Sequence, residues 1–199
     1  MQFEYLPSEP ILIDIIPNEL YDSLFRESKE VFNKTKELKN KDLAGHIKHE
    51  YTLKNNMKVL QPYIKKLSSS LANKLHPHDK QNYKGDNFVL KDLWVNFQKK
   101  YEFNPIHVHS GLFSFVIVMQ IPFELNDEMN MYEANGNVTS KLQFVVTNSF
   151  GRLCTYDMHI CKSDQKKIFF FPASLNHIVY PFYTSDKYRI TISGNVYGE

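Results

Sequence analysis

Residues 88–121 read FVLKDLWVNFQKKYEFNPIHVHSGLFSFVIVMQI, and they carry the clearest indication of the fold. Apolar residues either alternate with polar ones or run on continuously here, as they do in half-buried and fully buried strands. Aromatic and β-branched residues, which suit a pleated surface, are frequent. Turn residues divide the rest of the chain into similar short segments. We therefore expect strands near residues 88–98, 106–121, 142–147, 153–160, 167–171, 177–182 and 187–197.

The residues before this stretch show a helical pattern. Residues 11–16 predict one short strand, and an apolar stripe over residues 18–38 predicts a helix. A second helix is marked by apolar residues at steps of three and four, which lie on one helical face. These residues are Met57, Leu60, Ile64, Leu67, Leu71 and Leu75. Pro62 should either kink this helix or mark its start.

Many short strands after N-terminal helices predict a mainly β fold with helices (α+β), namely a sandwich or jelly roll that the helices brace. We expect a single domain over residues 1–199. Residues 1–86 would supply a strand and the supporting helices, and residues 87–199 the jelly-roll core. Residues 124–141 are polar and interrupt two apolar strands, so they predict either an active-site lid or a disordered loop.

Charge and hydropathy narrow the classes of partner. The 24 basic and 22 acidic residues leave a formal charge of +2, which gives no electrostatic support for a nucleic-acid or membrane partner. No segment approaches the roughly 20 apolar residues of a membrane span, and the first ten residues lack a secretion signal. The two cysteines, Cys154 and Cys161, are expected to be free thiols. The sequence therefore predicts a soluble intracellular protein.

Three histidines are candidate metal ligands. His107 and His109 lie two residues apart on a predicted strand, so both imidazoles can face one point. Neutral imidazole binds iron, zinc, copper and nickel, although such a pair is more often an ordinary pair of surface or core histidines. His177 follows an apolar strand and a turn. It is either a third ligand in a facial arrangement or a strand-edge histidine with a hydrogen-bonded ring.

A second polar group lies on the last predicted strand, where Arg189, Thr191 and Ser193 alternate with apolar residues. If this polar face points inward, Arg189 is a buried charge that requires an anionic partner. A guanidinium beside a hydroxyl is well matched to a carboxylate. If the face points outward, the strand is an ordinary amphipathic one.

Trp94, Asn96 and Gln98 share a face of the strand at 88–98. Inside a barrel, amide side chains of this kind are suited to hydrogen-bond a bound acid, and we take Trp94 and Asn96 as candidate cofactor-binding residues. On a solvent-exposed sheet the same residues would be unremarkable.

Residues 94–122, 169–182 and 189–196, in this order, resemble the 2-oxoglutarate- and iron(II)-dependent oxygenases. The resemblance covers residues 88–197 and is strongest to a branch related to prolyl hydroxylases and frequent in phage and marine bacterial genomes. It implies a double-stranded β-helix and an enzyme that uses Fe(II), 2-oxoglutarate and O₂ to hydroxylate a substrate. It also implies a cytoplasmic location, in the host if the protein is phage-encoded. The substrate, whether a small molecule or a protein side chain, and the oligomeric state are not indicated.

The resemblance also implies residue roles. His107 and His177 would be metal ligands, and Arg189 would bind the distal carboxylate of 2-oxoglutarate with Thr191 or Ser193 as its hydroxyl partner. These oxygenases usually have Asp or Glu at the position of His109. Either His109 completes a three-histidine iron site, which is chemically feasible, or a carboxylate comes from elsewhere. The candidates for that carboxylate are Asp157 and Glu102, and His159 is a further candidate donor.

Two other readings stay open. A cupin-like metal-binding protein would share the jelly roll without using 2-oxoglutarate, but its first motif continues to a glutamate, whereas here no acid follows His109 until Glu124. In a cupin, reversing the charge of Arg189 should spare metal-dependent function. A non-catalytic jelly-roll structural or binding module is the second alternative, because a fold does not fix a function. It predicts that His107→Ala and His177→Ala leave the biological role intact.

Overall fold

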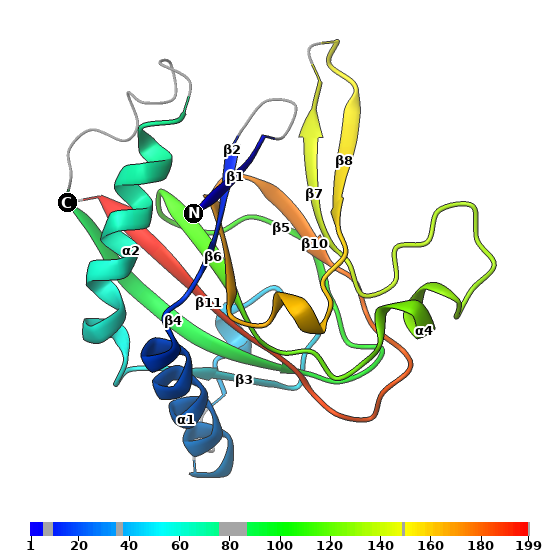
Figure 1. Ribbon diagram of the computed structural model, residues 1–199, viewed down its shortest axis with the longest axis horizontal. Helices are drawn as coiled ribbons and strands as arrows, with labels where there is room; N and C mark the ends of the chain where they lie inside the picture. The colour runs from blue at the N-terminus through cyan, green and yellow to red at the C-terminus, as the bar shows by residue number, and fades with distance from the viewer. Residues whose placement is uncertain (6–9, 35–37, 76–86, 149, 199) are drawn as a thin grey trace.

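The computed structural model describes residues 1–5, 10–34, 38–75, 87–148 and 150–198. Its strands form two antiparallel sheets that face each other, with two long helices on the outer side of the larger sheet (Figure 1). The larger sheet has the strand order β1-β2-β9-β6-β11-β4-β3, and the smaller has the order β5-β10-β7-β8. The mainly β, helix-braced double-stranded β-helix is therefore confirmed.

Among the described residues, seven strands form the larger sheet and four form the smaller one. The larger sheet contains β1 (Gln2–Tyr5), β2 (Pro10–Ile15), β3 (His49–Thr52), β4 (Phe88–Gln98), β6 (Phe113–Gln120), β9 (Lys167–Pro172) and β11 (Arg189–Gly198). The smaller contains β5 (Asn104–His107), β7 (Leu142–Thr147), β8 (Leu153–Met158) and β10 (Asn176–Val179). The helices are α1 (Asn18–Lys34), α2 (Met57–Ala72) and α4 (Leu125–Met129), and short 3₁₀ turns span Asn40–Asp42 and Lys162–Asp164.

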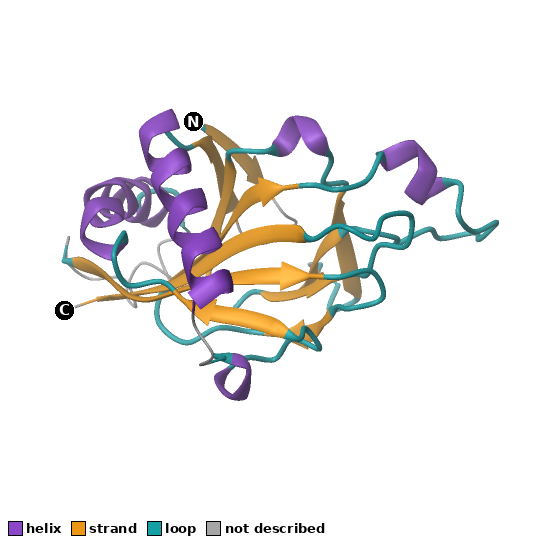
Figure 2. Cartoon of the chain, turned by 90° about the horizontal axis from the view of Figure 1, so that it is seen from below, coloured by secondary structure: helices purple, strands orange, loops and turns teal. Residues whose placement is uncertain are grey.

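Both faces of the larger sheet are covered. Figure 2 shows the long helices packed against one side of the strands. Their apolar stripes meet β-strand side chains in one core that includes Leu24, Leu60, Ile64, Phe115 and Phe170. A second core fills part of the space between the sheets and includes Val118, Phe144, Phe169, Phe171 and Phe182. The burial of this apolar area fixes the distance between the sheets and leaves a polar cavity where the apolar side chains end.

The alternation along β11 determines what faces this cavity. Ile190 and Ile192 join the core under the helices, whereas Arg189, Thr191 and Ser193 line the cavity on the opposite face. This is the period-two geometry of a strand. The inward orientation of the polar face is therefore confirmed.

The structure differs from the sequence prediction at 106–121, which is two strands and not one. β5 ends at His107 in the smaller sheet, and β6 begins at Phe113 in the larger sheet. Gly111 lies between them with φ +92°, a conformation that favours glycine. A Cβ there would come within 2.5 Å of the Val196 carbonyl oxygen. A strand-like pattern on both sides of the short turn concealed this crossing from one sheet to the other.

The N-terminal half also shows differences. α2 begins at Met57, so Pro62 lies inside the helix and does not mark its start. α1 ends at Lys34, and residues 35–37 of the predicted helix lie outside the described residues, as does the predicted boundary at residue 86. The short edge strands β1 and β3 were not predicted, because four residues carry too little periodicity. No helix among the described residues is long and apolar enough to cross a membrane.

The polar segment at 124–141 is ordered around α4. Glu128 is buried there, and its carboxylate accepts hydrogen bonds from the backbone N–H groups of Tyr183 and Thr184 at 2.8–3.0 Å. The hydroxyl of Thr139 donates to the Glu128 carbonyl at 2.9 Å. These contacts fasten the segment to the chain between β10 and β11. Its role as a lid stays a prediction.

Candidate metal centre

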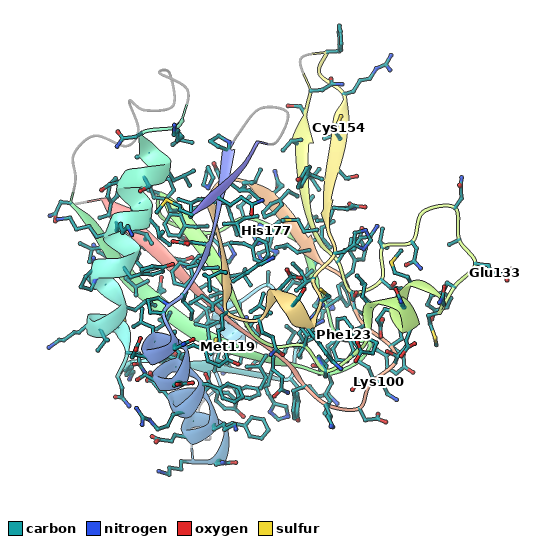
Figure 3. All side chains as sticks on the ribbon, viewed as in Figure 1. Lys100, Met119, Phe123, Glu133, Cys154 and His177 are labelled. Carbon is teal, nitrogen blue, oxygen red and sulfur yellow. The ribbon has the colours of Figure 1, made fainter. Side chains whose placement is uncertain are left out.

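His107, His109 and His177 come together between the two sheets. His107 ends β5 and lies directly opposite His177 of β10 in the antiparallel pairing, and His109 follows β5 by two residues. One ligand nitrogen from each ring lies within 4.8 Å of the other two. The Nε2 atoms of His109 and His177 are 3.2 Å apart. Figure 3 shows His177 in the interior of the molecule.

Backbone carbonyls fix two of these rings. The Nδ1 of His107 donates to the Pro105 carbonyl at 2.7 Å, and the Nδ1 of His177 donates to the Leu175 carbonyl at 2.9 Å. A carbonyl oxygen only accepts, so each Nδ1 carries the proton and each Nε2 keeps its lone pair. Such a partner on the other ring nitrogen is what usually orients a metal-bound histidine.

Burial holds the three imidazoles neutral. It lowers the pKa of His109 to about 3, with the neighbouring His107 adding to the effect. It lowers the pKa values of His107 and His177 as well. Neutral imidazole is the form that binds a metal ion. The cluster therefore presents unprotonated nitrogen donors to a metal ion at neutral pH.

The alternative ligands have other partners. The carboxylate of Asp157 accepts from the Lys141 ammonium at 2.8 Å and from the Gln143 amide at 2.7 Å. The Glu102 carboxylate accepts from backbone N–H groups, including that of Lys99 at 2.8 Å. Within the described part of the chain, the three histidines are the one group of His, Cys, Asp or Glu donors close enough to share an ion. His159 does not belong to it.

A cavity of about 220 Å³ lies beside the histidines. All of the sequence-predicted site residues line it: His107, His109, His177, Trp94, Asn96, Arg189, Thr191 and Ser193. The structure thus brings together residues from β4, β5, β10 and β11.

Arg189 lies in the wall of this cavity and is 3% exposed. Its Nε and Nη2 donate to Gln98 Oε1 at 3.0 and 2.8 Å. Its Nη1 donates to the Ser140 carbonyl at 2.9 Å, and Nη2 also donates to the Tyr180 carbonyl at 2.7 Å. These bonds use four of the five guanidinium N–H donors. Burial lowers the pKa of Arg189 to about 9, so the group stays charged at neutral pH.

None of these four bonds goes to a carboxylate. The guanidinium is therefore held in place by neutral acceptors, with one Nη1 donor remaining. A buried positive charge without a directly bound anion favours an anionic ligand.

The other predicted residues pack beside it. The amide of Asn96 donates to the hydroxyls of Thr191 at 3.1 Å and Ser193 at 3.4 Å, which occupy neighbouring positions on the paired strand β11. The ring of Trp94 lies 5.7 Å from that of His109, centroid to centroid. Trp94 thus contacts the histidine cluster, and Asn96 orders the hydroxyls next to Arg189.

Sequence reasoning missed several residues that line the cavity, among them Glu50, Asn104 and Ser140. Glu50 comes from the unpredicted strand β3, and Ser140 from the end of the polar segment at 124–141. Asn104 belongs to a strand whose start was placed two residues too late. In each case the local sequence carried no periodic signal.

Comparisons with known proteins agree with this geometry. A model of the family described as "Putative 2OG-Fe(II) oxygenase" matches residues 92–195, which is just over half of the chain. No curated protein sequence matches the chain.

Two solved structures share the fold. One is a prolyl-4-hydroxylase from Pseudomonas putida, with a TM-score of 0.58, 11% identity, and coverage of 95% of this chain and 92% of that one. The other is the viral collagen prolyl hydroxylase of Paramecium Bursaria Chlorella virus-1 in complex with 2-oxoglutarate. Its TM-score is 0.53 at 10% identity, with 94% of each chain covered. At these identities the likeness shows the fold alone. The family match over residues 92–195, which include the three histidines and Arg189, is what assigns the chain: it belongs to the 2OG-Fe(II) oxygenase family.

Proposed function

We propose that this protein is an Fe(II)- and 2-oxoglutarate-dependent dioxygenase that hydroxylates a substrate, with His107, His109 and His177 as the iron ligands. The observation that carries the proposal is the convergence of three neutral imidazole nitrogens beside a buried arginine. Imidazole suits Fe(II), and three ligands on one side leave positions open for other molecules. The donor set therefore fits the metal that the family uses.

Arg189 is the proposed anchor for the distal carboxylate of 2-oxoglutarate. Its remaining Nη1 donor suits a carboxylate oxygen, and its charge, on which Glu128 acts without a direct hydrogen bond, favours an anionic ligand. Thr191 and Ser193 present hydroxyls on the same face, held in position by Asn96. Trp94 packs on His109 and limits access of water to that ring. When bound together, iron, 2-oxoglutarate and O₂ supply the oxidising chemistry.

The third histidine changes the charge of the site. A carboxylate at this position would neutralise one of the two charges of Fe(II), whereas His109 leaves both. The proposed centre therefore favours anionic ligands in its open positions, and 2-oxoglutarate is a dianion. The metal ion held by the three histidines and the guanidinium of Arg189 would therefore both attract the same dianionic co-substrate.

The proposal is tested by Fe(II)-dependent conversion of 2-oxoglutarate to succinate under air. We expect Arg189→Gln to raise the KM for 2-oxoglutarate by roughly 10- to 150-fold, since a charge-assisted hydrogen bond contributes roughly 1.5–3 kcal/mol. Arg152→Gln, at an exposed position, is the matched control and should behave as the parent. Equal KM values for both variants would contradict the proposal that Arg189 binds 2-oxoglutarate.

A further inference from the structure

Glu50 is a buried carboxyl group in the wall of the same cavity, and the proposed iron and co-substrate sites do not use it. It is 1% exposed. In the β3–β4 pairing it lies opposite Asn96, which in turn lies opposite Thr191 in the β4–β11 pairing. Residues opposite one another in a sheet point to the same face. Glu50 therefore extends the polar wall of the cavity one strand beyond Asn96.

The acceptor atoms in this part of the wall have no hydrogen-bond donor. Among the described residues, Glu50 Oε2, Asn96 Oδ1 and Asn104 Oδ1 are all buried and without a partner. The Asn96 amide nitrogen donates towards β11, to Thr191 and Ser193, which leaves its oxygen directed away from that strand. Buried polar atoms are nearly always paired, so three unpaired acceptors lining one cavity indicate a missing donor.

The backbone brings two of these side chains together at Gly45. A Cβ at Gly45 would lie 2.4 Å from Asn104 Oδ1 and 2.9 Å from Glu50 Oε1. Glu50 and Asn104 thus approach the same point from two different strands, β3 of the larger sheet and β5 of the smaller one. A residue with a side chain at position 45 would displace both.

The charge of Glu50 is also unbalanced. Within the described residues no basic side chain forms an ion pair with it, and the charge that acts on its pKa is the like charge of Glu102. Burial, followed by Glu102, raises the pKa of the Glu50 carboxyl to about 8. A desolvated carboxyl of this kind is stabilised most by a cation that also donates hydrogen bonds.

We propose that Glu50, together with Asn96 and Asn104, binds a cationic nitrogen group of the substrate, a protonated amine or a guanidinium. The inference rests on the proposed function in taking this ligand to be the substrate. An ammonium has three N–H donors and a guanidinium five, which matches the three unpaired oxygens. Asn104 and His107 are three residues apart on β5, a span of about 10 Å. The nitrogen group would thus lie on the order of 10 Å from the position that faces the histidines.

The test uses butylammonium chloride as the probe and butan-1-ol as its uncharged counterpart. Binding of each is measured by calorimetry to the full chain loaded with Fe(II) and 2-oxoglutarate under nitrogen. We expect the parent to bind butylammonium at least tenfold more tightly than butan-1-ol. Glu50→Gln, which keeps the shape of the side chain, should lose this preference. Glu133→Gln removes an exposed carboxyl at the outer end of the loop after α4 and should keep it (Figure 3).

Two results would overturn the inference: no preference for butylammonium in the parent, or a preference that survives in Glu50→Gln. Circular dichroism and thermal unfolding of both variants show whether each is folded. The visible absorption band of the Fe(II)–2-oxoglutarate complex is recorded in the same samples. Its absence would contradict the proposed function, whereas the probe preference reports on Glu50 separately.

Discussion

His177 is the most buried member of the histidine cluster, at 1% exposed, and its ring centroid lies 4.1 Å from that of His107 and 5.0 Å from that of His109. The pairing of β10 with β5 places His177 opposite His107, so small movements of a loop would not displace it. His177→Gln removes one of three nitrogen donors. We expect Fe(II) affinity to fall by about 100-fold, at the upper end of what even outer-shell changes cause at metal sites.

The measurement is anaerobic equilibrium dialysis with Fe(II). His159→Gln is the control, because His159 is exposed and lies outside the cluster. If His177→Gln retained the parent affinity while His159→Gln lost it, the ligand assignment would be wrong.

At the residue scale, the sequence predicted most of the site because its members lie on regular strands. Alternation along β11 placed Arg189 with Thr191 and Ser193, and the spacing of His107 and His109 suggested converging rings. Glu50 could not be found in the same way. Its burial depends on the pairing of a four-residue strand with β4, a contact 46 residues away in the chain.

At the scale of elements, one buried carboxylate joins α1 to the start of α2. Glu27 of α1 accepts from the backbone N–H groups of Lys54, Asn55 and Asn56 and from the Asn56 side-chain amide, at 2.6–3.1 Å. It thereby pairs the N–H groups of the three residues that directly precede α2. The contact also holds both helices in place against the larger sheet.

Glu27→Gln should therefore destabilise the fold. The amide keeps one acceptor oxygen but loses the charge and the second oxygen, and we expect a loss of about 2 kcal/mol in the free energy of unfolding. Urea denaturation measures this value. Glu30→Gln, one turn further along α1 at an exposed position, should change it by less than about 0.5 kcal/mol. Equal effects of the two substitutions would contradict the stabilising role of the contact between Glu27 and the start of α2.

The bounds of single strands were easier to predict from sequence patterns than the division of a segment into two strands. Strands 88–98 and 142–147 were predicted at their observed bounds, since each is a single strand flanked by polar turn residues. The segment at 106–121 was not, because the alternation of apolar and polar residues continues from the end of β5 into the short turn before β6. Sheet membership is a property of the tertiary pairing, and hydropathy along the chain does not record it.

For the molecule as a whole, Glu50 links folding to pH. The unfolded chain releases this proton near the ordinary value of 4.5, whereas the folded chain holds it until the pKa of about 8. Folding therefore takes up a proton between these values. The contribution of Glu50 to stability is fully present below pH 4.5 and is lost as pH rises through 8.

We expect the free energy of unfolding of the metal-free parent to fall, relative to that of Glu50→Gln, between pH 5 and pH 9. Urea titrations at intervals across this range give the difference directly, and the substitution cancels contributions from all other titrating groups. A constant difference across the range would show that Glu50 titrates normally in the folded protein.

The overall architecture was predictable from the sequence because the two long helices precede most of the strands. Apolar steps of three and four end before residue 76, and the long succession of strand patterns begins at Phe88. The cavity was less predictable, since its wall combines β3, β4, β5, β10 and β11 with the end of the 124–141 segment. Only the closed fold brings these residues around one space.

The central claim is that one site holds Fe(II) through three histidines and 2-oxoglutarate through Arg189. Its most direct test is an anaerobic titration of the metal-free protein with Fe(II) and then 2-oxoglutarate, followed by visible absorption. We predict a charge-transfer band in the parent and in Arg152→Gln that is lost in Arg189→Glu. Iron binding without a band in the parent, or an equal band in Arg189→Glu, would contradict the claim.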